Sequence, residues 1–137
     1  MKVSLRTEYA CRVLAQLGKG FGGEEWAHID GLAEAESIPA NYLVQILNDL
    51  KNGGLIQSRR GKSGGYSLTR APESISLLEV LKAMEGELLE TASEVRGESG
   101  QRVQEIWKHL AGELESFARE ISVKDLMPGE DGEMYYI

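Results

Sequence analysis

Apolar residues recur at helical spacing through the first half of the chain. Ser4 can cap a first helix, which Gly18 or Gly20 ends. A brief second helix is expected over residues 29–37, and Pro39 is well placed to begin a third, which the Gly53-Gly54 pair stops. The third helix is predicted to bury a stripe of Tyr42, Leu43, Ile46, Leu47 and Leu50.

A basic, glycine-rich segment, S-R-R-G-K-S-G-G-Y, follows the third helix. Gly61, Gly64 and Gly65 supply the permissive backbone that a tight hairpin needs. Ile56 before the turn and Tyr66 after it are typical of short, half-buried strands. A helix followed by such a hairpin is the layout of a winged helix-turn-helix, in which the helix enters the major groove and the hairpin reaches the neighbouring backbone or minor groove. The pattern therefore indicates DNA binding.

Two further helices are predicted in the second half. Ser76 and Glu79 form a capping-box pattern ahead of a helix that Gly86 ends. The fold class is mainly α with a small β wing (α+β). We expect a winged helix-turn-helix DNA-binding domain over residues 1–86, with an appended helix. The chain then continues as a loop (87–100), a long dimerisation helix (101–121), and a C-terminal segment and tail (122–137).

The long helix carries more apolar surface than a small winged domain can cover alone. One interpretation is a core helix packed within the chain. The other is an interface with a second copy, which Trp107 and Phe117 favour because large aromatic residues are common anchors of interfaces. Two-fold dimers are also the usual form in which helix-turn-helix proteins bind palindromes. We therefore predict a homodimer that uses Val103, Ile106, Trp107, Leu110, Leu114 and Phe117.

The charge of the chain is unevenly divided. The formal net charge is −7, yet residues 1–72 hold nine Lys and Arg against seven Asp and Glu, which leaves 73–137 with a net charge of −9. A mildly basic head can still bind phosphates, because the relevant field is local to a Debye length of about 8–10 Å. The residues expected to face double-stranded DNA are Asn41, Tyr42, Val44, Gln45 and Asn48 on the third helix, with Arg59, Arg60 and Lys62 in the wing.

Several function classes find little support in the sequence. An enzyme would need a nucleophile, base or metal constellation, and we find no Ser/His/Asp set, phosphate loop or metal-ligand cluster. One cysteine, Cys11, excludes an intramolecular disulfide and fits a reducing compartment. Without an 18-residue apolar run or a signal peptide, we expect a cytoplasmic protein with no membrane partner.

Two alternatives to DNA binding and its regulation stay open. Asp49 and Glu34 near the expected reading surface would suit a winged module that binds protein. A redox switch at Cys11 is also conceivable, although a small half-buried side chain is ordinary at that position.

Four segments carry a resemblance to a known family. K-V-S-L-R-T-E-Y-A, N-Y-L-V-Q-I-L, R-G-K-S-G-G-Y-S-L-T-R-A-P and I-S-L-L-E-V-L-K-A-M-E-G are similar, in register over residues 1–87, to the Rrf-two family of winged-helix transcription regulators. The resemblance implies a dimeric regulator whose third helix and wing bind DNA. It places Asn41, Tyr42 and Gln45 on the reading helix, Arg60 in the wing, and Lys2 and Tyr9 near the DNA backbone.

One reading position departs from the family pattern. The family commonly has a glutamate where this chain has Val44, and a valine side chain cannot accept a hydrogen bond from cytosine N4. The DNA target of relatives therefore cannot be carried over to this chain.

The sensor region departs as well. Iron–sulfur members of the family carry three cysteines in the loop between the last two long helices, and residues 87–100 contain none. Cys11 alone cannot hold a cluster, because iron–sulfur centres need several thiolates. His28 and His109 are far apart in sequence, and His28 is expected to cap the second helix. We therefore expect a cluster-free member with no cofactor and no metal.

The last residues, G-E-M-Y-Y-I, resemble the tail of a cluster-free member that represses cysteine metabolism with cysteine synthase as its corepressor. The resemblance implies that Tyr135, Tyr136 and Ile137 form a partner-binding tail that inserts into the active site of cysteine synthase. Alternatively, the same residues pack back on the dimer. The predicted function is that of a repressor of cysteine or sulfur metabolism, the alternative being a regulator that responds to another effector.

Overall fold

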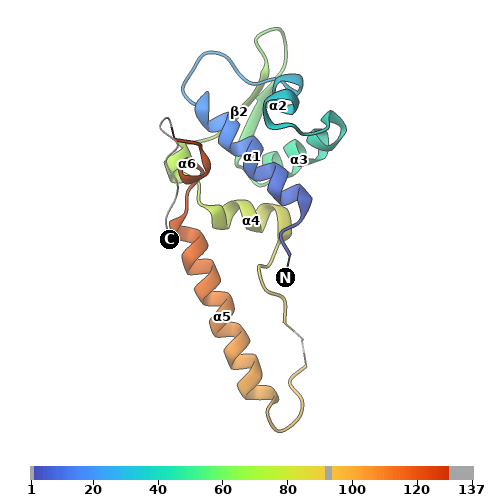
Figure 1. The fold of residues 1–137 in the computed structure, drawn as a ribbon, viewed down its shortest axis with the longest axis vertical. Helices are drawn as coiled ribbons and strands as arrows, with labels where there is room; N and C mark the ends of the chain where they lie inside the picture. Colours follow the sequence, from blue (N-terminus) through green and yellow to red (C-terminus); the bar gives the residue numbers. More distant parts are fainter. Residues whose placement is uncertain (1, 92–93, 130–137) are drawn as a thin grey trace.

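The computed structural model of the protein describes residues 2–91 and 94–129. A helical head holds the small sheet, and one long helix projects from it beside an extended loop (Figure 1). The elements in chain order are α1 (Leu5–Lys19), α2 (Ile29–Glu36), α3 (Ala40–Asn52), β1 (Ile56–Arg59), β2 (Gly65–Leu68), a 3-10 turn (Pro72–Ser74), α4 (Leu77–Glu85), α5 (Gly100–Glu120) and α6 (Val123–Leu126). The predicted fold class, mainly helical with a two-stranded wing, is confirmed.

The core of the head lies between α1, α2 and α3. Their inward faces are almost wholly inaccessible to solvent and share apolar side chains that recur every third or fourth residue, among them Val13, Leu14, Leu32, Leu43, Ile46, Leu47 and Leu50. The prediction that Tyr42 belongs to the buried stripe was wrong, because Tyr42 is 46% exposed. Leu43, Ile46, Leu47 and Leu50 already complete one helical face, so Tyr42 lies at its edge and contacts Tyr9 edge-on, with ring centroids 5.9 Å apart.

Local capping accounts for the helix ends. The Ser4 hydroxyl accepts a hydrogen bond from the Thr7 N–H at 3.2 Å, and Ser76 and Glu79 form the predicted capping box. His28 occupies the N-cap position of α2, as predicted, although its side chain makes no capping hydrogen bond. Pro39 lies at the N-cap of α3, one position before the helix.

The wing is an antiparallel hairpin with Ile56 opposite Leu68 and Arg59 opposite Gly65. Before α2 an isolated bridge adds to the hairpin, in which Ala27 exchanges backbone hydrogen bonds of 3.0 and 2.8 Å with Tyr66. Glycine is required at position 65, where φ is +139° and a Cβ would lie 2.6 Å from the Ala27 carbonyl oxygen. The wing is thus held against the segment before α2.

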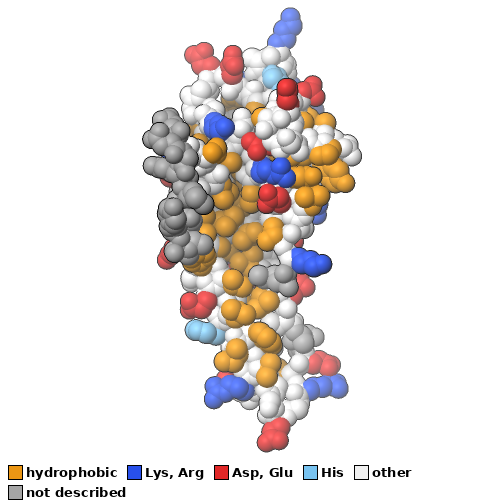
Figure 2. All heavy atoms as spheres, in the orientation of Figure 1, with side chains coloured by type: hydrophobic (Ala, Val, Ile, Leu, Met, Phe, Trp, Pro, Cys, Tyr) orange, Lys and Arg blue, Asp and Glu red, His pale blue; other side chains and the backbone are white. Residues whose placement is uncertain are grey.

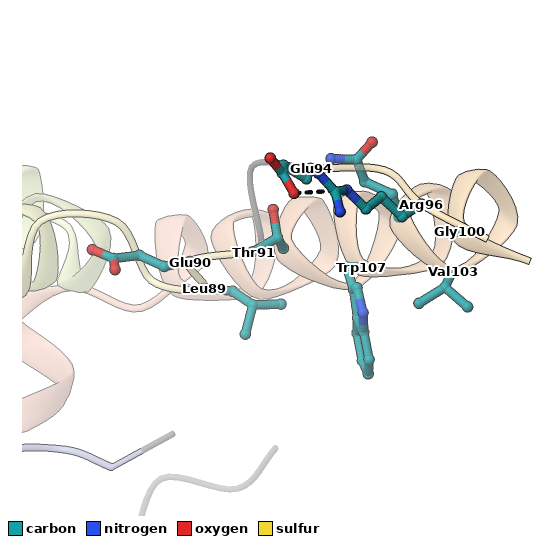
Figure 3. Close-up of a pocket in the computed structure, with 9 residues that line it drawn as sticks. Leu89, Glu90, Thr91, Glu94, Arg96, Gly100, Val103 and Trp107 are labelled. Atoms are coloured by element: carbon teal, nitrogen blue, oxygen red, sulfur yellow. Dashed lines mark ion pairs between the residues drawn. The ribbon is translucent and has the colours of Figure 1, made fainter.

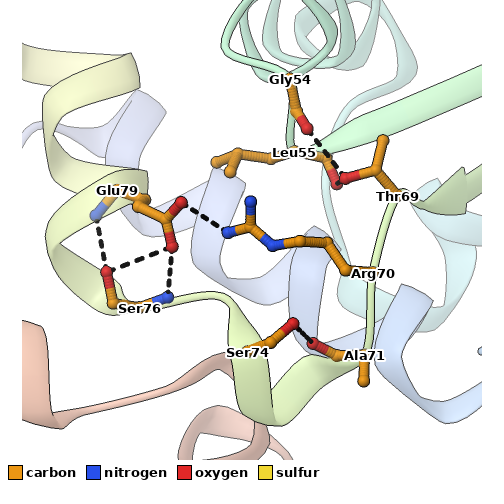
Figure 4. A network of polar contacts seen from close by, with 8 residues as sticks. All are labelled: Gly54, Leu55, Thr69, Arg70, Ala71, Ser74, Ser76 and Glu79. Atoms are coloured by element: carbon orange, nitrogen blue, oxygen red, sulfur yellow. Dashed lines mark hydrogen bonds and ion pairs between the residues drawn. The ribbon is translucent and has the colours of Figure 1, made fainter.

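A polar network joins the exit of the wing to α4 (Figure 4). Arg70 Nη2 donates to Glu79 Oε1 at 2.5 Å, and Glu79 also accepts from the Ser76 N–H at 2.9 Å. Burial opposes ionisation of Glu79, but the Ser76 N–H and Arg70 outweigh it and lower the pKa of the carboxyl group. The Thr69 hydroxyl donates to the Gly54 carbonyl oxygen at 2.8 Å, which fixes the turn after α3.

The segment after α5 returns to the head, which the sequence did not predict. Backbone hydrogen bonds join Leu77 N–H to the Ile121 carbonyl (2.7 Å) and Val123 N–H to the Ile75 carbonyl (2.9 Å). Val123 is fully buried, and α6 packs on α1. These bonds connect the C-terminal end of α5 to the start of α4.

Glu85, the last residue of α4, ties that helix to the start of α1. Its Oε1 accepts hydrogen bonds from the Ser4 hydroxyl at 2.6 Å and from the buried Thr7 hydroxyl at 2.5 Å. These bonds lower the pKa of Glu85 from its ordinary value of 4.5. The charged form therefore stabilises the junction between the two helices.

We predict that Glu85→Gln lowers the free energy of unfolding at pH 7 and that its difference from wild type shrinks in acid. Because the folded-state pKa is depressed, this stabilisation is present above the unfolded-state pKa and is lost as the pH falls through the folded value. Urea unfolding at a series of pH values between about 7 and 3 measures it. Glu87→Gln, at an exposed site, is the control. A difference that does not change with pH would show that the charge of Glu85 is irrelevant.

Candidate nucleic-acid interface

The outer face of α3 presents the residues that the sequence singled out. Its inner face is fixed by the core, so the opposite side faces solvent. Val44 is 53% exposed between two polar neighbours on this face. All five predicted reading residues are exposed on α3, namely Asn41, Tyr42, Val44, Gln45 and Asn48.

Tyr9 lies beside this face, whereas Lys2 lies at another site. Tyr9 contacts Tyr42, and the Arg12 guanidinium stands 4.9 Å from the centroid of the Tyr9 ring. Arg12 Nη1 also donates to the Glu36 carbonyl oxygen at 2.9 Å, which anchors the end of α2. Lys2 is exposed at the rim of a groove between α4 and α5 that Phe117 helps to line.

The basic side chains of the wing divide into two groups. The Arg59 guanidinium stacks on Trp26 at 4.2 Å from the ring centroid, and it donates to the Ser63 carbonyl oxygen at 2.8 Å and the Glu24 carbonyl oxygen at 3.1 Å. These contacts hold the Arg59 side chain against the hairpin and the segment before it. That its remaining N–H groups contact DNA stays a prediction. Arg60 and Lys62 are exposed near the turn. They are the wing cations that geometry leaves available to phosphate.

Asp49 joins α3 to α1 at the edge of the reading face. Its Oδ2 lies 2.5 Å from Arg6 Nη2, and its Oδ1 accepts a hydrogen bond of 2.9 Å from Gln45 Nε2. The Asp49 side chain is only 19% exposed. The carboxylate that seemed to favour a protein-binding module is therefore balanced by a cation. Sequence reasoning missed Arg6, because its partner lies 43 residues further along the chain.

Cys11 is half-buried in α1. Burial, with a smaller contribution from Glu8, raises the pKa of its thiol from 9.0 to about 11. The thiolate is the reactive form of cysteine, and at neutral pH it would be scarce here. This environment disfavours the redox-switch interpretation.

A cavity of about 420 Å³ lies between the loop before α5 and α5 itself (Figure 3). The Trp107 and Val103 side chains extend from the helix, and Glu94 and Arg96 form an ion pair of 2.9 Å on the loop side.

Within residues 2–91 and 94–129, no three His, Cys, Asp or Glu side chains are grouped so that they could hold a metal ion. None of the helices in the described part of the chain is both long and apolar enough to cross a membrane.

Known proteins match the chain over nearly its whole length. The Rrf2 family model, described as an iron-dependent transcriptional regulator, matches residues 3–129. A candidate HTH-type transcriptional regulator of Mycobacterium tuberculosis is 33% identical over 134 residues, which cover 94% of this chain and 83% of the relative. The HTH-type transcriptional regulator CymR of Bacillus subtilis is 28% identical over 141 residues and is covered completely, as is this chain.

Solved structures agree with this assignment. The structure of CymR, described as the global cysteine regulator of B. subtilis, has a TM-score of 0.75 at 26% identity. The match covers 92% of this chain and 95% of the CymR chain. The structure of IscR from T. potens has a TM-score of 0.72 at 27% identity, and the match covers 92% of this chain and 85% of the IscR chain. The chain therefore belongs to the Rrf2 family, and it is a winged helix-turn-helix transcriptional regulator rather than an enzyme.

Proposed function

We propose that the protein is a repressor that binds a palindromic DNA element as a homodimer, with α3 in the major groove and the wing on the adjoining backbone. The observation that carries the proposal is the outer face of α3, where polar side chains and Val44 are exposed over a buried inner face. An α-helix fits the major groove, whose floor carries the pattern of donors and acceptors that distinguishes the base pairs.

The chemistry of this face favours A·T pairs. A glutamine such as Gln45 can pair with the N6 and N7 edge of adenine, and an exposed valine such as Val44 can contact the methyl group of thymine. Arg60 and Lys62 would supply charge to the phosphates, which fixes orientation and carries no sequence information by itself.

We predict different effects from substitutions in the wing and in the helix. Arg60→Ala should lower affinity for all sequences by roughly 1–3 kcal/mol and reduce the dependence of affinity on salt, because a phosphate contact is lost. Gln45→Ala should relax preference at one base pair of each half-site more than it weakens binding. Selection from a randomised duplex library, followed by titration at several salt concentrations, measures both effects.

Arg96→Ala is the matched control for charge, because Arg96 lies on the exposed loop before α5. Failure of the wild-type protein to enrich any DNA sequence would overturn the proposal. The protein-binding module, for which Asp49 and Glu34 were considered, would then be preferred.

An uncovered apolar stripe supports the homodimer. Of the residues of α5, only Ala118 is buried. Large side chains along one face are between 40% and 53% exposed, namely Val103, Ile106, Trp107, Leu110 and Phe117. Figure 2 shows apolar side chains in a band that runs up along α5 toward α4. There the stripe meets a groove of about 410 Å³ that Leu77, Leu81, Leu114 and Phe117 line.

A second copy suits this surface because a two-fold interface is self-complementary and gives the symmetry of a palindrome. Full burial of an exposed apolar side chain contributes roughly 1.5–3 kcal/mol. These side chains are about half exposed, so each would add part of that free energy, and together they can support a stable pair. The interface would use the predicted residues Val103, Ile106, Trp107, Leu110, Leu114 and Phe117.

Leu110→Glu is predicted to convert the dimer to monomer, because a carboxylate buried in an apolar interface costs several kcal/mol. Light scattering at micromolar concentration measures the mass, and circular dichroism confirms that the helices remain. Gln101→Glu adds the same charge on the opposite side of α5 and should stay dimeric. A wild-type protein that is monomeric under these conditions would contradict the prediction.

We propose, further, that this member works without an iron–sulfur cluster. The ground is the sequence, which has one cysteine, Cys11, where a cluster needs several thiolates. Protein purified without oxygen should be colourless, with iron only at trace level by elemental analysis. A visible chromophore with stoichiometric iron would show that ligands of another kind are used.

We also propose that the regulator controls cysteine or sulfur metabolism with cysteine synthase as corepressor. Support comes from the full-length match to CymR and from the Met-Tyr-Tyr-Ile segment at residues 134–137. The tail residues Tyr135, Tyr136 and Ile137 lie outside the described residues. In the proposed complex the side chain of Ile137 would fill apolar space in the active site of the enzyme.

Removal of Ile137 is predicted to weaken binding of the organism's own cysteine synthase about tenfold to a hundredfold. The reason is that an isoleucine side chain contributes roughly 1.5–3 kcal/mol when it is buried. Calorimetry measures the complex, and Asp131→Asn is a control that leaves the last residues intact. Absence of binding heat, or equal affinity after the removal, would exclude the tail as the docking element.

A further inference from the structure

The carboxylate of Asp49 contacts two side chains, of which one is expected to touch bases and the other is not. Gln45 is one helical turn before Asp49 on α3, and Arg6 is in the first turn of α1. Both side chains reach the same carboxylate, Gln45 through its amide nitrogen at 2.9 Å and Arg6 through its guanidinium at 2.5 Å. A side chain of another helix is thereby connected to the reading face.

This arrangement decides which way the Gln45 amide points. A glutamine amide has a donor end and an acceptor end, and a free side chain can present either to a base. An ionised carboxylate only accepts hydrogen bonds, so only the NH₂ end of Gln45 can face Asp49. The carbonyl oxygen and the second N–H then remain for the groove. An acceptor beside a donor is the pair that matches N6 and N7 of adenine.

Arg6 makes this carboxylate compatible with DNA. An uncompensated negative charge beside the phosphates would repel them, whereas the Arg6–Asp49 pair is neutral as a whole. The Arg6 side chain is 50% exposed, and ion pairs this close to solvent add little to folding stability. Substitutions in the pair should therefore leave the fold intact, so that their effect on DNA can be measured.

We propose that Arg6 and Asp49 are positioning residues for sequence recognition: they hold the Gln45 amide in the orientation that selects adenine, without touching a base themselves. The inference rests on the proposed function and deepens it, because it assigns the base preference of one position to a contact between α1 and α3. It does not depend on the dimer interface or on the tail.

The test compares four proteins on the same randomised duplex library: wild type, Asp49→Asn, Arg6→Gln and the double variant. A good pair of hydrogen bonds to a base discriminates by about 5- to 150-fold. Asp49→Asn should lose most of this factor at the base pair that Gln45→Ala relaxes, because asparagine can donate or accept and lets the amide turn over. Arg6→Gln removes the side chain that holds the Asp49 carboxylate beside Gln45, so it should lose part of the preference there. Because it also leaves the carboxylate uncompensated, it should bind every sequence more weakly.

The double variant separates orientation from charge. It removes one positive and one negative charge, so affinity for all sequences should recover relative to Arg6→Gln, while preference at the Gln45 position stays relaxed. Added to Gln45→Ala, Asp49→Asn should cause no further loss of preference, since both act through one amide. Arg96→Gln, remote on the loop before α5, controls for loss of a cation.

Unchanged discrimination by Asp49→Asn, or discrimination restored in the double variant, would overturn the inference while the proposed function stands. Enrichment of no sequence by the wild type would instead overturn the proposed function and this inference with it. Urea unfolding of each variant distinguishes these results from a loss of folding.

Discussion

Burial of the inner face of α3 sets which side chains that helix exposes to solvent. Leu43, Ile46, Leu47 and Leu50 are at most 1% exposed. At roughly 1.5–3 kcal/mol for each buried side chain, they outweigh any single polar contact on the outer face. Because successive residues of a helix are offset by about 100°, a roll of α3 by one residue would expose part of this apolar face and bury Gln45. The core therefore fixes the rotation of α3, although none of its own members lies on the exposed face.

Nearby charges, rather than the net charge of the chain, determine the electrostatic field around α3 and the wing. The chain as a whole carries −7, the sum of +2 over residues 1–72 and −9 beyond them. Arg60 and Lys62 are nevertheless exposed in the wing, and Asp49 is balanced by Arg6. Charges separated by more than about 8–10 Å are largely screened at physiological salt, so the local arrangement governs contact with phosphates. An acidic body would, in addition, weaken binding to nucleic acid at random sites. Net charge is a poor guide to function in this chain.

Sequence patterns predicted those features that depend on neighbours in the chain. Ser4 and the Ser76–Glu79 box mark helix starts through bonds that span three residues, and Gly53 marks the end of α3. Features that depend on distant contacts were missed. The stacking of Arg59 on Trp26, the Arg6–Asp49 pair and the return of α6 to α1 each join segments far apart in sequence. For that reason the sequence predicted most of the side chains that are exposed on α3, whereas the contacts that orient them required the structure.

In the proposed complex, two copies of the winged head bind one DNA element through α3 and the wing. Hydroxyl-radical footprinting on a duplex enriched by the wild-type protein tests it most directly, because it maps backbone contacts on both strands. We expect two protected half-sites related by two-fold symmetry, with centres one helical turn of roughly 10 base pairs or a multiple of it apart. Protection of a single site without symmetry, or no protection on any enriched sequence, would contradict it.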